Sequence, residues 1–250
     1  MKPGVAVVIS AWEGHPALVL RRLVNSMKRF APGVPFDPVL SINGEGYDLP
    51  EDLAAVFRHV FRRENTGYNL GAWDHAWRHL AGYDYYLFLQ DECFIRRGNW
   101  VRLFLQRFAG DRDCGLIGEN LNPGWNHSWQ DLIESESFSE KKRQRAMLYR
   151  QLLQQWGIPA GQTAAHLTSV VQFTARRILE EVDGYPIRNE HGEAVAAEIG
   201  FSRKIAAAGY SLHQLGRWRH QTIGHPQWPT EALWRKFRES LRPTAHRGRS

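Results

Sequence analysis

The chain has 250 residues, of which 43% are hydrophobic, and it carries a formal net charge of +6. This is enough for one large α/β domain with a buried core, and Cys93 and Cys114 are too few for a disulfide framework or a zinc cluster. No apolar run approaches the roughly 20 residues that a membrane span needs, so we expect a soluble or peripheral cytoplasmic protein. The basic charge suits an anionic ligand or surface, which includes nucleotides, nucleic acids and membranes.

In the first half of the chain, short apolar runs alternate with helical patterns. Buried strands are predicted at residues 5–10, 39–43, 60–63, 85–89 and 114–117. Helices are predicted at residues 17–30, 51–57, 72–80 and 100–108. This alternation predicts a single α/β domain, with a doubly wound and mostly parallel sheet flanked by helices.

The second half is less regular. We expect a polar, aromatic loop with some helix over the site at residues 120–139, and then a helix at residues 140–156. A strand at 168–173, helices at 175–182 and 193–208, and a last strand at 211–218 follow. The domain is expected to end at residue 226. Residues 227–250 form a basic, aromatic tail that suits either packing on the domain or contact with an anionic membrane.

Around residues 61–96 the sequence places polar groups at the end of a buried strand. The apolar run 85–89 ends on Gln90, Asp91 and Glu92. Charge beside an apolar core is tolerated when it is hydrated, paired or holding a cation. Because ligands of open α/β sheets bind beyond the carboxyl ends of the strands, the acidic pair stands where a metal and a phosphate would bind. The simpler alternative is a solvated strand end.

Before that strand lies a turn of low side-chain bulk that contains Asn65, Gly67, Asn69 and Gly71. Glycine permits positive φ and close backbone approach, and backbone N–H groups at the start of the next helix can meet a phosphate or sugar oxygen. The turn therefore suits donor binding, with a plain strand-to-helix connection as the alternative. It is not a dinucleotide-binding fingerprint, because no G-x-G-x-x-G follows the first strand.

The order of these segments resembles the GT-A glycosyltransferases of family 2, which include bacterial rhamnosyl- and galactosyltransferases. The likeness is carried by VAVVIS, ENTGYNLGAWDHAW, YYLFLQDE, VVQFTARRILEEVDGYP and the helix around Glu198, and it spans about residues 5–225. The chain departs from the family at Gln90-Asp91-Glu92, where the family has Asp-x-Asp, and at Glu198, which replaces a Glu-Asp pair.

The resemblance implies transfer of a sugar from a nucleotide-diphosphate donor to a glycan or lipid-linked acceptor, as in cell-surface polysaccharide synthesis, by an inverting and metal-dependent reaction. It implies that Mg²⁺ or Mn²⁺ binds Asp91, Glu92 and His220, with His225 and His213 as weaker candidates. The donor pocket that it implies is formed by Ser10, Ala11, Asn43, Arg63, Asn65, Gly67, Asn69, Gly71 and Asp91.

Glu198 is the predicted general base, because an inverting transfer needs a carboxylate to take the proton of the acceptor hydroxyl. Glu193 and Asp183 are the alternatives, and an ordinary solvated glutamate is the simplest interpretation. Trp125 and Trp129 are predicted to stack on the acceptor, although tryptophan is also common in cores.

Three other functions compete with this one. A nucleotidyltransferase would have a glycine-rich basic loop after the first strand, where this chain reads Ala11-Trp12-Glu13-Gly14-His15. A non-catalytic, basic nucleic-acid-binding module would concentrate its charge, whereas here it is spread out except at residues 141–145 and in the tail, so we expect no nucleic-acid partner. A degenerate transferase would bind a sugar nucleotide without turning it over.

Overall fold

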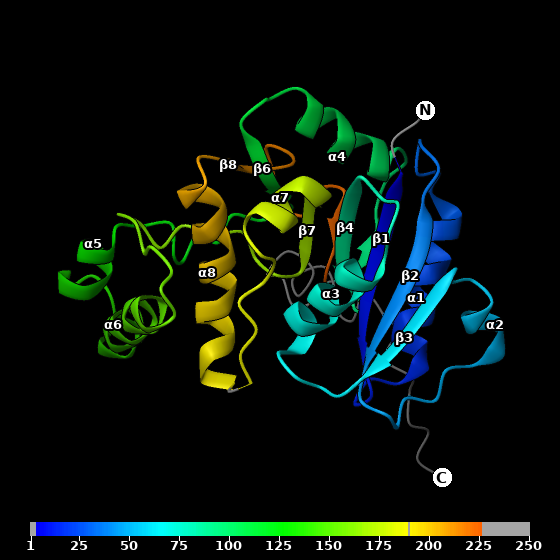
Figure 1. The fold of residues 1–250 in the computed structure, drawn as a ribbon, viewed down its shortest axis with the longest axis horizontal. Helices are drawn as coiled ribbons and strands as arrows, with labels where there is room; N and C mark the ends of the chain where they lie inside the picture. The colour runs from blue at the N-terminus through cyan, green and yellow to red at the C-terminus, as the bar shows by residue number, and fades with distance from the viewer. Residues whose placement is uncertain (1–3, 190, 227–250) are drawn as a thin grey trace, which may run out of the picture.

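The backbone of the fold is a central sheet, seen in a computed structural model that describes residues 4–189 and 191–226. Within these ranges the sheet has seven strands in the order β3-β2-β1-β4-β7-β6-β8 (Figure 1). Their bounds are β1 Val5–Trp12, β2 Asp37–Asn43, β3 His59–Arg63, β4 Tyr85–Gln90, β6 Cys114–Gly118, β7 Val171–Ala175 and β8 Ser211–Gln214. A small second sheet pairs β5 (Phe94–Ile95) with β9 (Ile223–Gly224).

Strands β1 to β4 are parallel and therefore end at one edge of the sheet. β1 pairs in parallel with both β2 and β4, and β2 pairs in parallel with β3. Their register sets Ser10 beside Ser41 and Gln90, and Asn43 beside Arg63. β7 runs antiparallel to its neighbours β4 and β6. The predicted α/β class with a mostly parallel sheet is confirmed.

Helices cover both faces of this sheet. Their bounds are α1 Ala17–Arg29, α2 Glu51–Ala54, α3 Tyr68–His79, α4 Trp100–Ala109, α5 Trp129–Glu134, α6 Glu140–Gln155, α7 Arg176–Glu181 and α8 Ala194–Ala207. In Figure 1, α3 lies in front of the central strands and α1 lies behind them. α3 starts at Tyr68, four residues before the predicted helix, so the glycine-containing turn leads directly into it.

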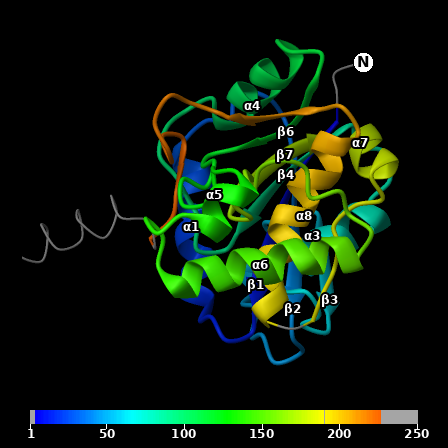
Figure 2. The same ribbon diagram turned by 90° about the vertical axis from the view of Figure 1, so that its left-hand side faces the viewer.

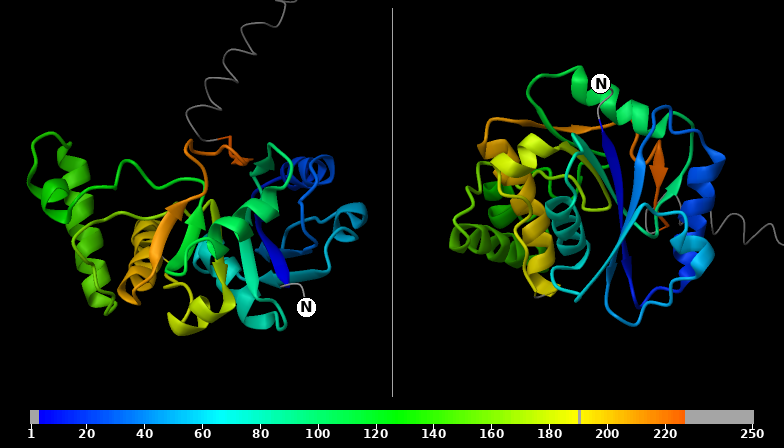
Figure 3. Two further views of the ribbon diagram at one scale, coloured as in Figure 1. Left: turned by 90° about the horizontal axis from the view of Figure 1, so that it is seen from above. Right: turned by 45° about the vertical axis from the view of Figure 1, so that its right-hand side comes forward.

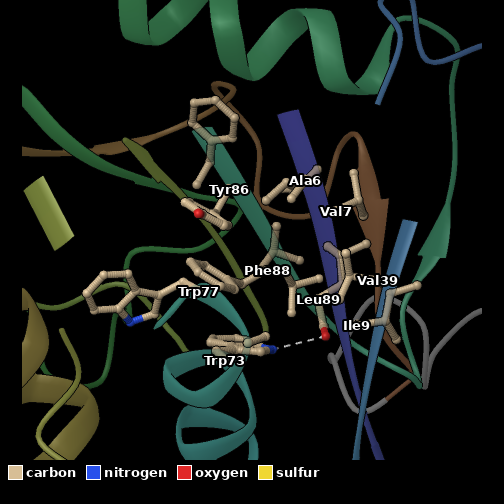
Figure 4. Close-up of a cluster of buried hydrophobic side chains, with 14 of the residues drawn as sticks. Ala6, Val7, Ile9, Val39, Trp73, Trp77, Tyr86, Phe88 and Leu89 are labelled. Atoms are coloured by element: carbon tan, nitrogen blue, oxygen red, sulfur yellow. Dashed lines mark hydrogen bonds between the residues drawn. The ribbon is translucent and has the colours of Figure 1, made fainter. Parts of the chain in front are cut away.

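An aromatic core fixes α3 on the sheet (Figure 4). Trp73 of α3 is fully buried and stacks on Phe88 of β4, with ring centroids 5.4 Å apart. Its indole N–H donates to the carbonyl oxygen of Leu89 at 3.3 Å. This contact fixes the start of α3 relative to the end of β4. The apolar residues of β1 and β4 are buried on both faces, which explains their unbroken apolar pattern.

Two helices form a lobe with a small core of its own. α5 and α6 bury Trp129, Leu132 and Leu153 together with Ile199 of α8. The lobe lies on the far side of α8 from the sheet (Figures 2 and 3). Trp129, Leu132 and Phe138, from the segment that is predicted to cover the site, belong to the core of this lobe.

Two further observations complete the fold. Cys93 and Cys114 are buried free thiols. Among the described residues, no helix combines the length and the apolar character that crossing a membrane requires. The predicted tail, residues 227–250, lies outside the described residues.

Candidate active site

An open pocket of about 350 Å³ lies at the shared carboxyl edge of β1, β2 and β4. The β1 end, the β2 end, the turn before α3 and the β4 end all contribute to its walls. It is lined by Ser10, Ala11, Trp12, His15, Asn43, Asn65, Tyr68, Asn69, Gln90 and Asp91. The structure thus brings together six of the predicted donor-site residues: Ser10, Ala11, Asn43, Asn65, Asn69 and Asp91.

Asp91 is a buried carboxylate held at the floor of this pocket. It is only 3% exposed, and its backbone N–H donates to the carbonyl oxygen of Ser10 at 3.0 Å. Its two carboxylate oxygens lie 3.1 and 3.0 Å from Nδ1 of His15. The hydrogen bond to Asp91 raises the pKa of His15, and partial burial opposes this effect. The sequence offered no signal for His15, which comes from the connection between β1 and α1.

Glu92 faces a second histidine from the other end of the chain. Its Oε2 lies 3.5 Å from Nε2 of His225. Burial raises the pKa of Glu92, and burial lowers the pKa of His225 to about 4. The imidazole of His225 is therefore neutral at neutral pH, which is the form that can bind a metal.

The segment that carries His225 is anchored by Glu119, at the end of β6. The carboxylate of Glu119 accepts the backbone N–H groups of Ile223 at 2.9 Å and Thr222 at 3.2 Å. Burial raises the pKa of Glu119 to about 7, against the lowering effect of these hydrogen bonds. The side chain is 1% exposed, so this anchor lies in the protein interior.

His220 and His213 were the other predicted histidine ligands. His220 is buried in the same C-terminal segment, and burial lowers its pKa to about 2. His213 lies in β8 and pairs with Asp111 at 2.8 Å. His225 lies 3.5 Å from Glu92 of the acidic pair. Within the described residues, no group of three or more His, Cys, Asp or Glu side chains could by itself hold a metal ion.

The turn before α3 shapes the pocket wall through its own hydrogen bonds. Arg63 donates to the side-chain oxygen of Asn43 and to the carbonyl oxygen of Thr66, and Asn43 donates to the carbonyl oxygen of Tyr68 at 2.9 Å. Burial lowers the pKa of Arg63. Arg63 is not among the residues that line the pocket, although it was predicted to be one of them. Its hydrogen bonds hold the turn instead.

The two predicted glycines of this turn have steric roles. Gly67 has a φ of +72°, and a Cβ there would lie 2.5 Å from Cγ2 of Ile187. A Cβ at Gly71 would collide with the carbonyl oxygen of Thr66. Gly67 is required by its positive φ and by the side chain of Ile187, and Gly71 by the close approach of the Thr66 backbone.

Glu198 lies in a smaller hollow, of about 90 Å³, beside the first pocket. Tyr68 and Asn69 line both spaces. One carboxylate oxygen of Glu198 accepts the backbone N–H of Ser169, and the other lies 3.6 Å from Nε2 of His166.

The peptide groups of Ser169 join the two spaces. Its carbonyl oxygen accepts hydrogen bonds from the side-chain amides of Asn69 and Gln90, the latter at 2.8 Å. Its N–H donates to Glu198. Gln90 is the residue that makes the acidic motif irregular, and here its amide ties the end of β4 to the segment that holds Glu198.

The remaining predicted residues lie elsewhere. Trp129 is 2% exposed, and its indole N–H donates to the carbonyl oxygen of Ala160 at 3.0 Å, so stacking of Trp129 on an acceptor is wrong. Trp125 is half-buried in the same lobe, 5.2 Å from the ring of Tyr149. Asp183 is turned to Arg78 at 2.9 Å, and Glu193 stands at the start of α8. Neither of these two acids lines the pocket or the hollow.

Comparisons with known proteins define the fold. No protein-family model matches the chain, and no curated protein matches it. Among solved structures, the mannosyltransferase PcManGT from Pyrobaculum calidifontis, in complex with GDP-Man and Mn2+, is similar with a TM-score of 0.53 and 13% sequence identity. The match covers 85% of this chain and 55% of that chain, so this chain spans about half the length of its structural neighbour. At this identity the likeness shows a shared GT-A-like fold.

Proposed function

We propose that this protein is a glycosyltransferase that takes a sugar from a nucleotide-diphosphate donor. The observation that carries the proposal is the buried carboxylate of Asp91 on the floor of an open pocket, at the carboxyl edge of a GT-A-like sheet. Ligands of open α/β sheets bind at this edge. A neighbour of the same fold binds GDP-Man and Mn2+. The nucleotide sugar would enter the pocket lined by Ser10, Asn43 and Asn65.

The residues at the end of β4 fit a divalent cation. Asp91 and Glu92 offer hard carboxylate oxygens, and Mg²⁺ or Mn²⁺ commonly takes one or two of these and completes its shell with phosphate and water. His225, neutral and 3.5 Å from Glu92, adds a nitrogen donor at the same place. When bound, the cation would stabilise the negative charge that develops on the diphosphate.

Glu198 is the proposed general base. It lies in a hollow that shares Tyr68 and Asn69 with the donor pocket, so an acceptor in the hollow would stand next to the donor. Its carboxylate is oriented by the N–H of Ser169. A carboxylate in this position can take the proton of an acceptor hydroxyl during a single, inverting displacement.

The acceptor that we propose is a glycan or a lipid-linked sugar. The hollow carries Arg188 beside Glu198, and Arg188 lies over the ring of Trp156 at 4.4 Å. The guanidinium of Arg188 suits a sugar with a polar or anionic substituent. Peripheral contact with a membrane through the tail stays a prediction, because the tail lies outside the described residues.

Turnover of nucleotide sugars tests this proposal. The protein is incubated with UDP-, GDP-, CDP- and dTDP-linked sugars and Mn²⁺, and release of the nucleoside diphosphate is measured. We expect one nucleotide class to be turned over, and we expect Glu198→Gln to lower kcat by about 100-fold or more, as loss of a general base does. Glu193→Gln is the matched control, since this residue does not line the hollow. Binding without turnover would indicate a degenerate transferase, and equal rates for Glu198→Gln and wild type would remove Glu198 as the base.

A further inference from the structure

Behind Glu198 lies a buried histidine whose hydrogen bonds fix its protonation. His166 is fully buried, and its Nδ1 lies 2.8 Å from the carbonyl oxygen of Ala164. A carbonyl oxygen only accepts hydrogen bonds, so Nδ1 carries a proton. The state of the other nitrogen, Nε2, then decides what His166 presents to Glu198.

The side-chain amide of Asn122 settles the state of Nε2. The oxygen of this amide accepts the backbone N–H of Gly124 at 3.2 Å, which leaves the NH₂ group facing Nε2 of His166 at 3.2 Å. Since the amide nitrogen donates, Nε2 accepts. His166 is therefore a neutral imidazole, and the single lone pair of its Nε2 accepts the amide N–H of Asn122.

Glu198 faces this lone pair with one oxygen. Its Oε1 accepts the N–H of Ser169, and its Oε2 lies 3.6 Å from Nε2 of His166. Two acceptors that face each other do not form a hydrogen bond, but a proton on Glu198 lets its O–H group compete with the weaker Asn122 N–H donor for the lone pair of Nε2. A shift from 3.6 Å to a hydrogen-bonding distance of about 2.9 Å is enough.

We propose that His166 is a positioning residue for Glu198, and that its Nε2 exchanges the amide N–H of Asn122 for the O–H of the Glu198 carboxyl group once that group has taken the acceptor's proton. This inference rests on the proposed function. As the acceptor oxygen bonds to the anomeric carbon, its O–H bond breaks and the proton passes to Glu198. The electron pair of the sugar–phosphate bond leaves with the diphosphate. His166 thus stabilises the product side of the proton transfer.

A pair of substitutions separates this role from a merely structural one. Asparagine at position 166 reaches as far as Nδ1 and can keep the bond to Ala164, whereas glutamine reaches as far as Nε2 and can keep a polar atom facing Glu198. We expect His166→Asn to lower kcat about tenfold, the worth of one hydrogen bond, with KM changed less than twofold. We expect His166→Gln to stay within about threefold of wild type. The reverse order, with the asparagine variant active and the glutamine variant impaired, would overturn the proposal.

A second measurement needs no substrate. Nitrogen-15 NMR of histidine-labelled protein reports which ring nitrogens carry protons, and the His166 signals are assigned from their loss in His166→Gln. We expect Nδ1 protonated and Nε2 unprotonated in wild type, and a shifted Nε2 signal in Glu198→Gln, whose amide can donate to it. A His166 protonated on both nitrogens, or on Nε2 alone, would refute the proposed geometry.

The NMR experiment also separates the two proposals. If wild type turns over no nucleotide sugar, the proposed function fails while the NMR result still decides the pairing of His166 with Glu198. If neither His166 variant folds, Asn122→Asp replaces the amide donor with a carboxylate that holds a proton on Nε2. We then expect kcat to fall about tenfold and the Nε2 signal to become that of a protonated nitrogen. An unchanged rate in this folded variant would contradict the proposal.

Discussion

The buried carboxylate of Glu119 predicts an unusual dependence of stability on pH. Glu119 is 1% exposed and holds the backbone of Thr222 and Ile223, and with it the segment that places His225 near Glu92. Burial raises its pKa from 4.5 to about 7. The perturbation that isolates this effect is Glu119→Gln, which keeps the shape and one acceptor oxygen but does not ionise.

The magnitude follows from the difference between the folded and unfolded proteins. Because the folded pKa of Glu119 is the higher one, the stability linked to its protonation is fully present below pH 4.5 and is lost as the pH rises through 7. A change from 4.5 to about 7, at about 1.4 kcal/mol per unit, amounts to about 3 kcal/mol. Wild type should therefore lose about 3 kcal/mol relative to Glu119→Gln between pH 4 and pH 8.

Urea unfolding of both proteins at a series of pH values measures this difference. Glu134→Gln, on the exposed surface of α5, is the matched control and should follow wild type at every pH. A free-energy difference between wild type and Glu119→Gln that does not change with pH would refute the reasoning, because it would mean that Glu119 ionises in the folded protein as it does in the unfolded chain.

Three further predictions concern the walls of the site. Gly67→Ala should destabilise the protein by about 1–3 kcal/mol more than Gly82→Ala. Both glycines have positive φ, but only at Gly67 would the added Cβ lie 2.5 Å from the side chain of Ile187. Equal melting temperatures of the two variants would contradict this prediction. Trp12→Ala should weaken nucleotide binding by about 1 kcal/mol, because it removes an aromatic side chain from the pocket wall. Trp218, which is exposed and lies outside the pocket, is the control, and Trp218→Ala should leave the affinity unchanged. Equal affinities of the two variants in calorimetry would refute this prediction. Gln90→Glu should cost about 1–3 kcal/mol of stability, because a carboxylate would face the carbonyl oxygen of Ser169. Gln154→Glu, on the exposed face of α6, is the control and should leave the stability unchanged. Urea unfolding measures both, and an unchanged stability of Gln90→Glu would argue against the link through Ser169.

The sequence predicted the parts of the site that depend on the sheet. Parallel strands end at one edge, so the polar residues at or near the carboxyl ends of β1, β2 and β4 had to lie together, and Ser10, Asn43 and Asp91 do so. Their apolar strands are continuous, which made the strand ends easy to locate.

The parts that depend on loop paths could not be predicted. His15 meets Asp91 across 76 residues of sequence, and Ser169 meets Gln90 across 79, with no periodicity that marks either pair. Trp129 was misplaced for another reason. The lobe of α5 and α6 needs apolar side chains for its own core, and a buried tryptophan supplies one while its N–H finds a carbonyl partner.

The most direct test of the central claim is binding of a nucleoside diphosphate at Asp91. UDP, GDP, CDP and dTDP are each added with and without Mn²⁺ to wild type and to Asp91→Asn, and the melting temperature is measured. At 100 times its dissociation constant a ligand adds about 2.7 kcal/mol, which is a rise of about 5–10 °C for a chain of this size. We predict such a rise with one nucleotide, dependent on Mn²⁺ and lost in Asp91→Asn. No rise with any nucleotide, or an equal rise in Asp91→Asn, would contradict the assignment of this pocket to a nucleotide-sugar donor.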